Sequence, residues 1–229
     1  MTSNLLTLIK PHKKIFITGT DTEVGKTYCT ALIIKYLLKH ELYVMPFKPI
    51  SAGTEYIEEL GDKVNEDAYE LWLACNKKFS LSQINPIVYD HAIAPHIAAE
   101  LENKSLNKSL LTKILKESEV EVDVQLIEGA GGWLLPLNNE ELMSDWVAEQ
   151  QLPVIMVVVI KLGCLNHALL TAQAIKASGC KLIGWIANFK DGETQVGRQN
   201  LEFIKQKLSA PLFFEVQPNQ SEIDDDIDN

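Results

Sequence analysis

The sequence predicts an α/β fold with a mostly parallel central sheet and helices on both of its faces. Short apolar runs alternate along the chain with amphipathic stretches of helical length. One run, 154–160, is almost wholly β-branched, which is typical of a central parallel strand buried on both faces. Most of the conspicuous polar residues directly follow such a run, and ligands of these sheets bind beyond the carboxyl ends of the strands.

Each element is predicted from its own stretch of sequence. Strands are predicted at 15–18, 42–47, 122–127, 154–160, 182–187 and 212–216. Helices are predicted at 26–39, 106–118, 142–150, 166–178 and 193–208. A further helix is expected near Asp67, because Asp67 and Glu70 have the spacing of a capping box ahead of an apolar run. Strands that alternate with helices in this way imply right-handed crossovers.

No repeat, low-complexity tract or Gly/Ser linker divides the 229 residues. We therefore expect a single domain over residues 1–229, ending in a short acidic tail at about 219–229. A metal site in that tail is disfavoured, because no predicted strand or helix would fix its carboxylates.

Composition and charge exclude several classes of function. The chain has 21 Lys and Arg residues against 31 Asp and Glu residues, a formal net charge of −10. Such an acidic surface repels nucleic acids and anionic lipids, so a bound nucleotide must be held by a local device. No apolar stretch reaches the roughly 20 residues of a membrane-spanning helix, and the four cysteines lack paired or metal-type spacing. Because no leader pattern is seen at the start, we expect a cytoplasmic protein with reduced thiols.

Residues 18–27 form a candidate phosphate loop between the first predicted strand and the first predicted helix. A glycine-rich turn exposes backbone N–H groups, and the helix N-terminus adds positive potential. Lys26 can reach the outer phosphates of a nucleotide, and the Thr27 hydroxyl can ligate Mg²⁺. Five residues separate Gly19 from Gly25, one more than in the common pattern. The order of strand, Gly-Lys-Thr and helix still predicts a P-loop NTPase-like fold that hydrolyses or transfers a triphosphate.

Two carboxylates are candidate magnesium ligands. Glu128 ends the strand predicted at 122–127, and the glycine-rich stretch 129–132 that follows lets the backbone approach a ligand closely. Mg²⁺ usually takes one or two carboxylates besides phosphate oxygens and water. The alternative for Glu128 is a solvated loop residue, and the alternative for Asp67, the weaker candidate, is a helix N-cap.

Lys48 follows the second predicted strand, and Pro46 and Pro49 fix the backbone that aims its ammonium. A solvated surface lysine is the ordinary alternative. A second anion site is possible where a helix opens after Gly163, because its first N–H groups are free. Cys164 in that stretch is favoured as a packing residue over a nucleophile, since no base stands at a defined relation to it.

Five motifs occur in a characteristic order along the chain. They are residues 19–27, Lys48-Pro49, residues 128–133, residues 161–168 and residues 184–188. Together they resemble the dethiobiotin synthetase family over about residues 13–216, including the five-residue spacing of its phosphate loop. No single motif carries the resemblance, which makes it specific.

The resemblance implies an ATP- and Mg²⁺-dependent ligase that makes dethiobiotin from 7,8-diaminopelargonic acid and CO₂. In that family one substrate amine becomes a carbamate, and the carbamate oxygen attacks the γ-phosphate to give a carbamic–phosphoric anhydride. The second amine then closes the ureido ring and expels phosphate. The resemblance also implies a homodimer whose substrate site is shared across the interface.

The same resemblance implies roles for individual positions. The catalytic positions are Lys48, Lys26, Thr22 and Glu23. The ATP-binding positions are Glu23, Val24, Gly25, Lys26, Thr27, Tyr28, Asp67, Glu128, Gly129, Ala130, Gly131 and Asn188, the last of which matches the residue that hydrogen-bonds adenine. The substrate-binding positions are Lys48, Ser51, Ala52, Gly163, Cys164, Leu165 and Asn166. The metal positions are Thr27, Asp67 and Glu128.

The chain departs from the family's pattern in two places. Ala52 stands where the family usually has a hydroxyl residue, and either Ser51 or Thr54 could make that contact instead. Residues 216–220 differ from the family's usual turn near the adenine.

Two other classes of protein are alternatives. A related amidoligase would need a glutaminase domain, for which 229 residues leave no room. A partition-type ATPase would carry Lys-Gly-Gly at the start of its loop and often a basic amphipathic helix, and neither pattern occurs.

Overall fold

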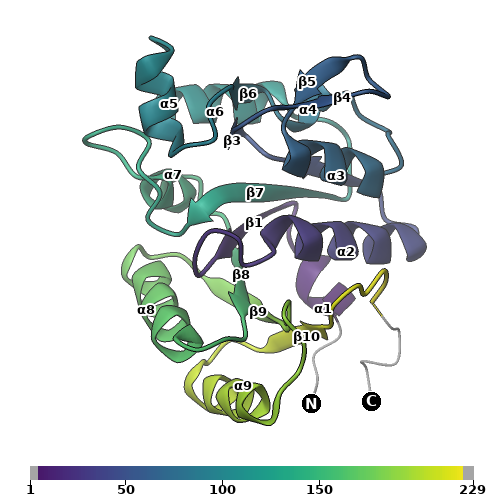
Figure 1. Cartoon of the computed structure of the whole chain (residues 1–229), viewed down its shortest axis with the longest axis vertical. Coiled ribbons are helices and arrows are strands. Elements are labelled where there is room, and N and C mark those ends of the chain that lie inside the picture. The colour runs from purple at the N-terminus through teal and green to yellow at the C-terminus, as the bar shows by residue number, and fades with distance from the viewer. Residues whose placement is uncertain (1–4, 224–229) are drawn as a thin grey trace.

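A six-stranded parallel sheet forms the centre of the molecule (Figure 1). The computed structural model describes residues 5–223. The strands of the sheet are β1 (Lys14–Gly19), β2 (Val44–Phe47), β7 (Val124–Gly132), β8 (Val154–Val159), β9 (Leu182–Asn188) and β10 (Leu212–Val216). They lie in the order β10-β9-β8-β1-β7-β2, and each neighbouring pair is parallel. The predicted α/β fold is confirmed.

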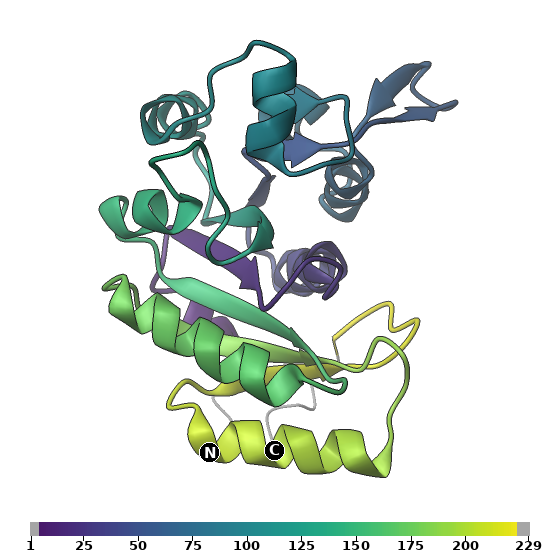
Figure 2. The same ribbon diagram turned by 60° about the vertical axis from the view of Figure 1, so that its left-hand side comes forward.

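Helices cover both faces of this sheet (Figures 1 and 2). They include α2 (Lys26–Lys39), α6 (Lys108–Glu117), α7 (Met143–Glu149), α8 (Cys164–Ala177) and α9 (Gln195–Lys207). The chain passes from β1 to β2 through α2 in one direction along the sheet, and from β7 to β10 in the other. Right-handed crossovers therefore put α2 on one face and α7, α8 and α9 on the opposite face.

The middle of the sheet is the most deeply buried part of the molecule. Every residue of β8 is buried, and in β1 only Lys14 is not. Because helices cover both faces, all side chains of these strands meet apolar neighbours, which explains the β-branched run in β8. The phosphate loop therefore leaves the sheet from one of its most deeply buried strands.

Local signals at the helix ends account for most of the boundaries. Thr194 caps α9 by accepting a hydrogen bond from the Gly197 N–H at 3.0 Å, and Asn107 caps α6 in the same way. Helix α2 spans the predicted residues 26–39. Helix α8 begins at Cys164 rather than at the predicted residue 166, because Gly163 is its N-cap, with a left-handed backbone at φ 93°.

The predicted capping box at Asp67 is wrong. Helix α3 (Glu66–Ala74) begins two residues earlier than a cap at Asp67 requires, and its N-cap is Asn65, whose side chain accepts a hydrogen bond from the Ala68 N–H at 3.3 Å. Asp67 therefore lies inside the first helical turn, where a negative charge is favourable, and its carboxylate is not used as a cap.

The segment between β2 and α6 folds into short elements that the sequence patterns did not predict. Strand β3 (Ile50–Ala52) pairs with β6 (Ile87–Tyr89), β4 (Glu55–Ile57) forms a hairpin with β5 (Asp62–Val64), and α4 (Leu81–Ile84) and α5 (Pro95–Leu101) complete the segment. It lies above β7 in Figure 1, and the hairpin stands out from the body in Figure 2. Such short runs are below the length at which hydrophobic periodicity is informative.

Both ends of the described chain pack onto the domain. Helix α1 (Leu5–Ile9), which was not predicted, buries Leu5 and Ile9. Near the other end, the Tyr28 hydroxyl donates to the Gln220 carbonyl, and Ile223 is buried. Residues 224–229 of the expected acidic tail lie outside the described residues. Between residues 5 and 223, no helix is both long and apolar enough to cross a membrane.

Candidate active site

A cavity of about 920 Å³ lies beside the phosphate loop and the start of α2. Its other walls come from the stretch after β2, from α3, from residues 92–95 before α5 and from the end of β7. The predicted site residues in its lining are Thr22, Glu23, Gly25, Lys26, Thr27, Tyr28, Lys48, Ser51, Ala52, Asp67, Ala130 and Gly131. The fold thus brings residues far apart in the sequence into one cavity.

The phosphate loop turns through two residues with left-handed backbone. Glu23 has φ 55° and Gly25 has φ 84°. A Cβ at Gly25 would lie 2.3 Å from Nδ2 of Asn188, so glycine is required there for space as well as for conformation. Gly25 is also the N-cap of α2, and within residues 5–223 no side chain caps that helix. The N–H groups of the first helical turn are therefore open to an anion.

Lys26 lies at the start of α2 and is 8% exposed. Its Nζ donates to the Asp21 carbonyl at 3.3 Å, across the loop that it follows. Burial lowers the pKa of Lys26, against the opposing field of Glu128. A phosphate in the loop would favour the charged form again, because an anion stabilises a nearby ammonium.

Lys48 stands at the centre of a charged network that reaches from the buried Glu128 to the half-exposed Asp67. Its Nζ lies 2.8 Å from Oε1 of Glu128 and 2.9 Å from Oδ2 of Asp67. The Thr27 hydroxyl donates to the same oxygen of Glu128 at 2.8 Å. Lys48 is 2% exposed and Glu128 is fully buried. The alternatives of a solvated surface lysine and a solvated loop glutamate are therefore wrong.

The carboxylates of the network keep Lys48 protonated. Burial by itself would lower its pKa, but Glu128 and Asp67 outweigh burial and raise the pKa of Lys48 to about 12. Burial by itself would raise the pKa of Asp67, but Lys48 outweighs burial and lowers it. The Lys48 ammonium is therefore held between two carboxyl groups that favour its charged form.

Strand β7 carries Glu128 and continues to Gly132, whereas the sequence predicted that it ends at residue 127. Its pairing with β1 runs from Gln125 to Glu128 and then shifts in register before Gly132. A Cβ at Gly129 would lie 2.7 Å from the ring of Phe16, so only glycine lets the strand pass there. After this register shift, the end of the strand lies along the cavity, and Ala130 and Gly131 form part of its wall.

The side chains around Glu128 fit a magnesium ion. Its Oε2 is buried and has no hydrogen-bond partner among the described residues, a costly state for a carboxylate oxygen. Thr27, Asp67 and Glu128 offer hydroxyl and carboxylate oxygens, the donors that Mg²⁺ prefers beside phosphate oxygens and water. In the described part of the chain, no group of three or more His, Cys, Asp or Glu side chains could hold a metal. Phosphate oxygens would therefore have to complete the coordination.

Ser51 is the hydroxyl residue that lines the cavity beside Ala52. Its Oγ donates to Oδ1 of Asn85 at 2.6 Å, and its side chain is buried. Thr54 instead donates to Asp90 at 3.3 Å and is not part of the lining. Ser51 is thus better placed than Thr54 to make the contact that a hydroxyl at position 52 would make. Because Ser51 donates its hydrogen to Asn85, its Oγ would accept a hydrogen bond in that contact.

Several predicted residues lie outside the lining of this cavity. Val24, Glu128 and Gly129 are among them, and Glu128 lies behind the lining residues Thr27 and Lys48, which contact it. The start of α8, with its N-cap Gly163 and residues 164–166, is not part of the lining. Cys164 there is buried, and burial raises the pKa of its thiol, which agrees with a packing role. Asn188 ends β9, is 3% exposed, and donates through Nδ2 to the Val24 carbonyl at 2.9 Å. The Val24 side chain lies in the hydrophobic core, so only its backbone can face a ligand.

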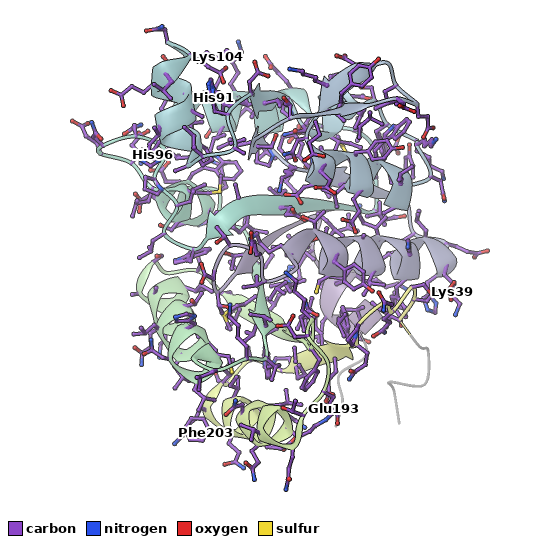
Figure 3. The ribbon with its side chains drawn as sticks, in the orientation of Figure 1. Lys39, His91, His96, Lys104, Glu193 and Phe203 are labelled. Atoms are coloured by element: carbon purple, nitrogen blue, oxygen red, sulfur yellow. The ribbon has the colours of Figure 1, made fainter. Side chains whose placement is uncertain are left out.

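Several lining residues were not predicted from the sequence. Glu70 lies one turn after Asp67 on α3, and burial raises its pKa. Residues 92–95, which lead into α5, form another wall. His91 and His96 flank this stretch in the sequence and are labelled near α5 in Figure 3. Lys190 follows β9, and its Nζ donates to the Glu23 carbonyl at 3.4 Å. No motif marks these positions, although Lys190 could have been suspected from its closeness to Asn188.

Known proteins resemble this chain over most of its length. The family model described as AAA domain matches residues 13–224. The chain is 40% identical over 201 residues to the ATP-dependent dethiobiotin synthetase BioD of Vibrio parahaemolyticus, a match that covers 88% of this chain and 87% of that protein. It is 42% identical over 201 residues to the ATP-dependent dethiobiotin synthetase BioD of Pseudoalteromonas translucida, with 87% and 88% covered.

Solved structures that resemble the chain have the same fold. A ParA family ATPase from Chlorobium tepidum matches with a TM-score of 0.53 at 14% identity, over 92% of this chain and 86% of that chain. The MinC:MinD cell division complex from Aquifex aeolicus matches with a TM-score of 0.51 at 16% identity, over 92% and 83%. At such identities the likeness shows the fold alone, and it confirms the predicted P-loop architecture.

Proposed function

This chain belongs to the dethiobiotin synthetase family, and from that premise we propose that it makes dethiobiotin from 7,8-diaminopelargonic acid, CO₂ and ATP. One amine of the substrate adds to CO₂ and loses a proton, giving a carbamate. The carbamate oxygen attacks the γ-phosphorus of ATP, and ADP leaves. The second amine then attacks the carbonyl carbon of the mixed anhydride and loses a proton, phosphate leaves, and the ureido ring is closed.

The buried, protonated Lys48 is the observation that carries this proposal. The carbamate and the triphosphate are both anions, so their approach requires fixed positive charge between them. Lys48 lines the cavity, follows β2 on a backbone fixed by Pro49, and is kept charged by Glu128 and Asp67. In the proposed reaction its ammonium holds the carbamate oxygen against the γ-phosphate.

The phosphate loop is proposed to bind the triphosphate. Lys26 and the free N–H groups at the start of α2 would neutralise its outer phosphates. Thr27, Asp67 and Glu128 would hold Mg²⁺, which when bound supplies charge neutralisation on the phosphate oxygens. Thr22 and Glu23 line the cavity beside these groups and would face the substrate amines.

We further propose a homodimer in which the start of α8 of one chain completes the cavity of the other. Within one chain that helix N-terminus lies outside the cavity. Leu162, just before it, is 97% exposed, and Leu134 and Leu170 are more than half exposed. If these side chains form one contiguous apolar patch, that patch would mark a protein–protein interface. The N–H groups after Gly163 would then receive the carboxylate of the substrate.

We propose that residues 1–229 form a single domain that carries out the whole reaction. Its cysteines at 29, 75, 164 and 180 are free, which suits a reducing compartment, so we propose that it works in the cytoplasm.

The experiment that tests the function measures ADP release by the purified protein. Release is expected to require diaminopelargonic acid and bicarbonate together. Lys48→Ala should reduce it by about 10³-fold while calorimetry shows retained Mg²⁺–ATP binding, because the lysine is needed for the second anion. ADP release that ignores the diamine would contradict the proposal and favour a partition-type ATPase.

Two controls support that experiment. Lys205→Ala removes an exposed lysine that pairs with Glu202 on α9, and it should leave the rate unchanged. Removing Lys48 also leaves the buried Glu128 carboxylate without its cation, so circular dichroism must show that the variant is folded.

A further inference from the structure

The carbonyl groups of the phosphate loop are held by side chains from outside it. Asn188 donates through Nδ2 to the Val24 carbonyl at 2.9 Å. Lys190 donates through Nζ to the Glu23 carbonyl at 3.4 Å. Both donors come from the end of β9, which is separated from β1 in the sheet by β8. Neither contact follows from the phosphate-loop motif itself.

The pairing of β1 with β8 continues into the first residue of the loop. The Thr20 N–H donates to the Val157 carbonyl of β8 at 3.0 Å, so the loop starts from a fixed point next to the strand that separates it from β9. Glu23 then adopts a left-handed backbone although it is not glycine, a conformation that residues with a side chain rarely adopt and that its surroundings must support. The adjacent carbonyls of Glu23 and Val24 are the two that β9 holds.

The donors themselves are well anchored. Asn188 is 3% exposed, and its own carbonyl accepts from the Ile160 N–H at 2.8 Å. The next residue, Phe189, donates its N–H to the Val216 carbonyl at 2.8 Å. Arg198 of α9 stacks over the Phe189 ring at 4.9 Å, and it also pairs with Glu193, which lies near α9 in Figure 3. The backbone from which Lys190 extends is therefore fixed on both sides.

We propose that Asn188 and Lys190 are positioning residues that hold the phosphate loop in its anion-binding shape. A carbonyl held outside the loop cannot turn its lone pairs toward a phosphate, and the N–H groups are left to face the cavity. This role rests on the proposed use of the loop to bind ATP. It differs from the adenine contact expected of Asn188, because it acts on the phosphates whether or not a base is present.

Inorganic tripolyphosphate separates the two roles, because it has phosphates but no nucleoside. Calorimetry with Mg²⁺–ATP and with Mg²⁺–tripolyphosphate is carried out on the full chain and its variants. Lys190→Met should weaken both ligands about fivefold, the effect of losing one hydrogen bond near the surface. Asn188→Ala should weaken both about tenfold or more, since the Val24 carbonyl loses a buried donor.

Matched variants exclude simple loss of charge or of stability. Lys190→Arg keeps a donor and should stay within about twofold of the wild type. Lys181→Met removes an exposed lysine just before the other end of β9 and should change nothing. The Lys190→Met defect should persist at about 1 M salt, where charges more than roughly 3 Å apart are screened. In turnover assays the KM for ATP should rise while kcat stays within about twofold.

Three results would contradict the positioning role of Asn188 and Lys190 while leaving the proposed ATP-dependent function standing. They are unchanged tripolyphosphate binding by both variants, weakening confined to ATP, and a Lys190→Met defect that disappears at high salt. A wild-type protein that binds neither ligand would instead remove the proposed ATP-dependent function, and this inference with it.

Discussion

The two halves of the cavity are built in different ways. The half beside the phosphate loop is formed by strand ends of the central sheet, and its polar groups are buried and paired within one chain, as in Thr27, Lys48 and Glu128. The other half is formed by the short elements between β2 and α6, whose wall includes the 42% exposed Ile93. The difference suggests a division of labour in which the sheet fixes the triphosphate and the less regular segment recognises the substrate.

The two halves meet at Lys48. Its Nζ contacts Glu128 from the sheet and Asp67 from α3, which belongs to the second half. The reaction proposed for the site joins a triphosphate to a carbamate, so a charge shared by both halves stands where the two reactants must meet.

Glu128→Gln should have the largest effect of the changes that test this division. The amide keeps the shape of the side chain but removes a charge that holds Lys48 and is proposed to hold Mg²⁺. We expect turnover to fall about 100-fold and the Mg²⁺ concentration for half-maximal rate to rise, as is typical when a metal site loses such a group. The KM for diaminopelargonic acid should change little.

A second buried residue of β7 provides the control for this change. Gln125→Ala removes hydrogen bonds to Ser118 and Met45 away from the cavity, so it should lower the melting temperature without changing the Mg²⁺ dependence. Equal Mg²⁺ dependence in Glu128→Gln and wild type would show that the sheet half does not hold the metal.

Leu162→Glu tests whether the substrate half is incomplete in one chain. If its exposed side chain packs against a second copy, a charge there should convert a dimer to a monomer in light scattering. The KM for diaminopelargonic acid should then rise about tenfold, while Mg²⁺–ATP binding stays unchanged. Leu101→Glu, at a 61% exposed position on α5, serves as the matched control. A wild-type monomer with full activity would contradict the shared site.

The sheet half was largely predictable from the sequence, because its signals are local. The β-branched run of β8 and the Gly-Lys-Thr stretch that opens α2 each carry their own pattern. The pairing of Lys48 with Glu128 was not visible, since 80 residues separate them and their contact depends on β2 lying next to β7. Sequence reasoning placed both residues at strand ends but could not show that one neutralises the other.

The second half shows why local patterns fail. Asp67 and Asn65 are both residue types that cap helices, and the capping-box spacing favours Asp67, which is not the cap. Asn65 also donates to the Gly53 carbonyl at 3.0 Å, a contact from outside the helix that favours it as the cap. In the same way, β3 and β6 exist only because distant stretches pair with each other.

Asn65→Ala should have the smallest effect and addresses the place where the halves join. It removes the cap of α3 and the tie to Gly53, so the free energy of unfolding should fall by about 1 kcal/mol. The melting temperature should drop by roughly 2–4 °C in a chain of this size. Because α3 carries Asp67, the Mg²⁺ dependence should shift a few-fold, far less than in Glu128→Gln.

Asn65→Asp separates the two contacts that the alanine variant removes together. Aspartate can accept from the Ala68 N–H but cannot donate to the Gly53 carbonyl, so it should restore the cap alone. Recovery of both the melting temperature and the Mg²⁺ dependence would assign the positioning of Asp67 to the cap. Recovery of stability without the Mg²⁺ dependence would assign it to the tie with Gly53. If Asn65→Ala matched the loss in Glu128→Gln, the metal would depend on the second half as much as on the sheet, and the division of labour would fail.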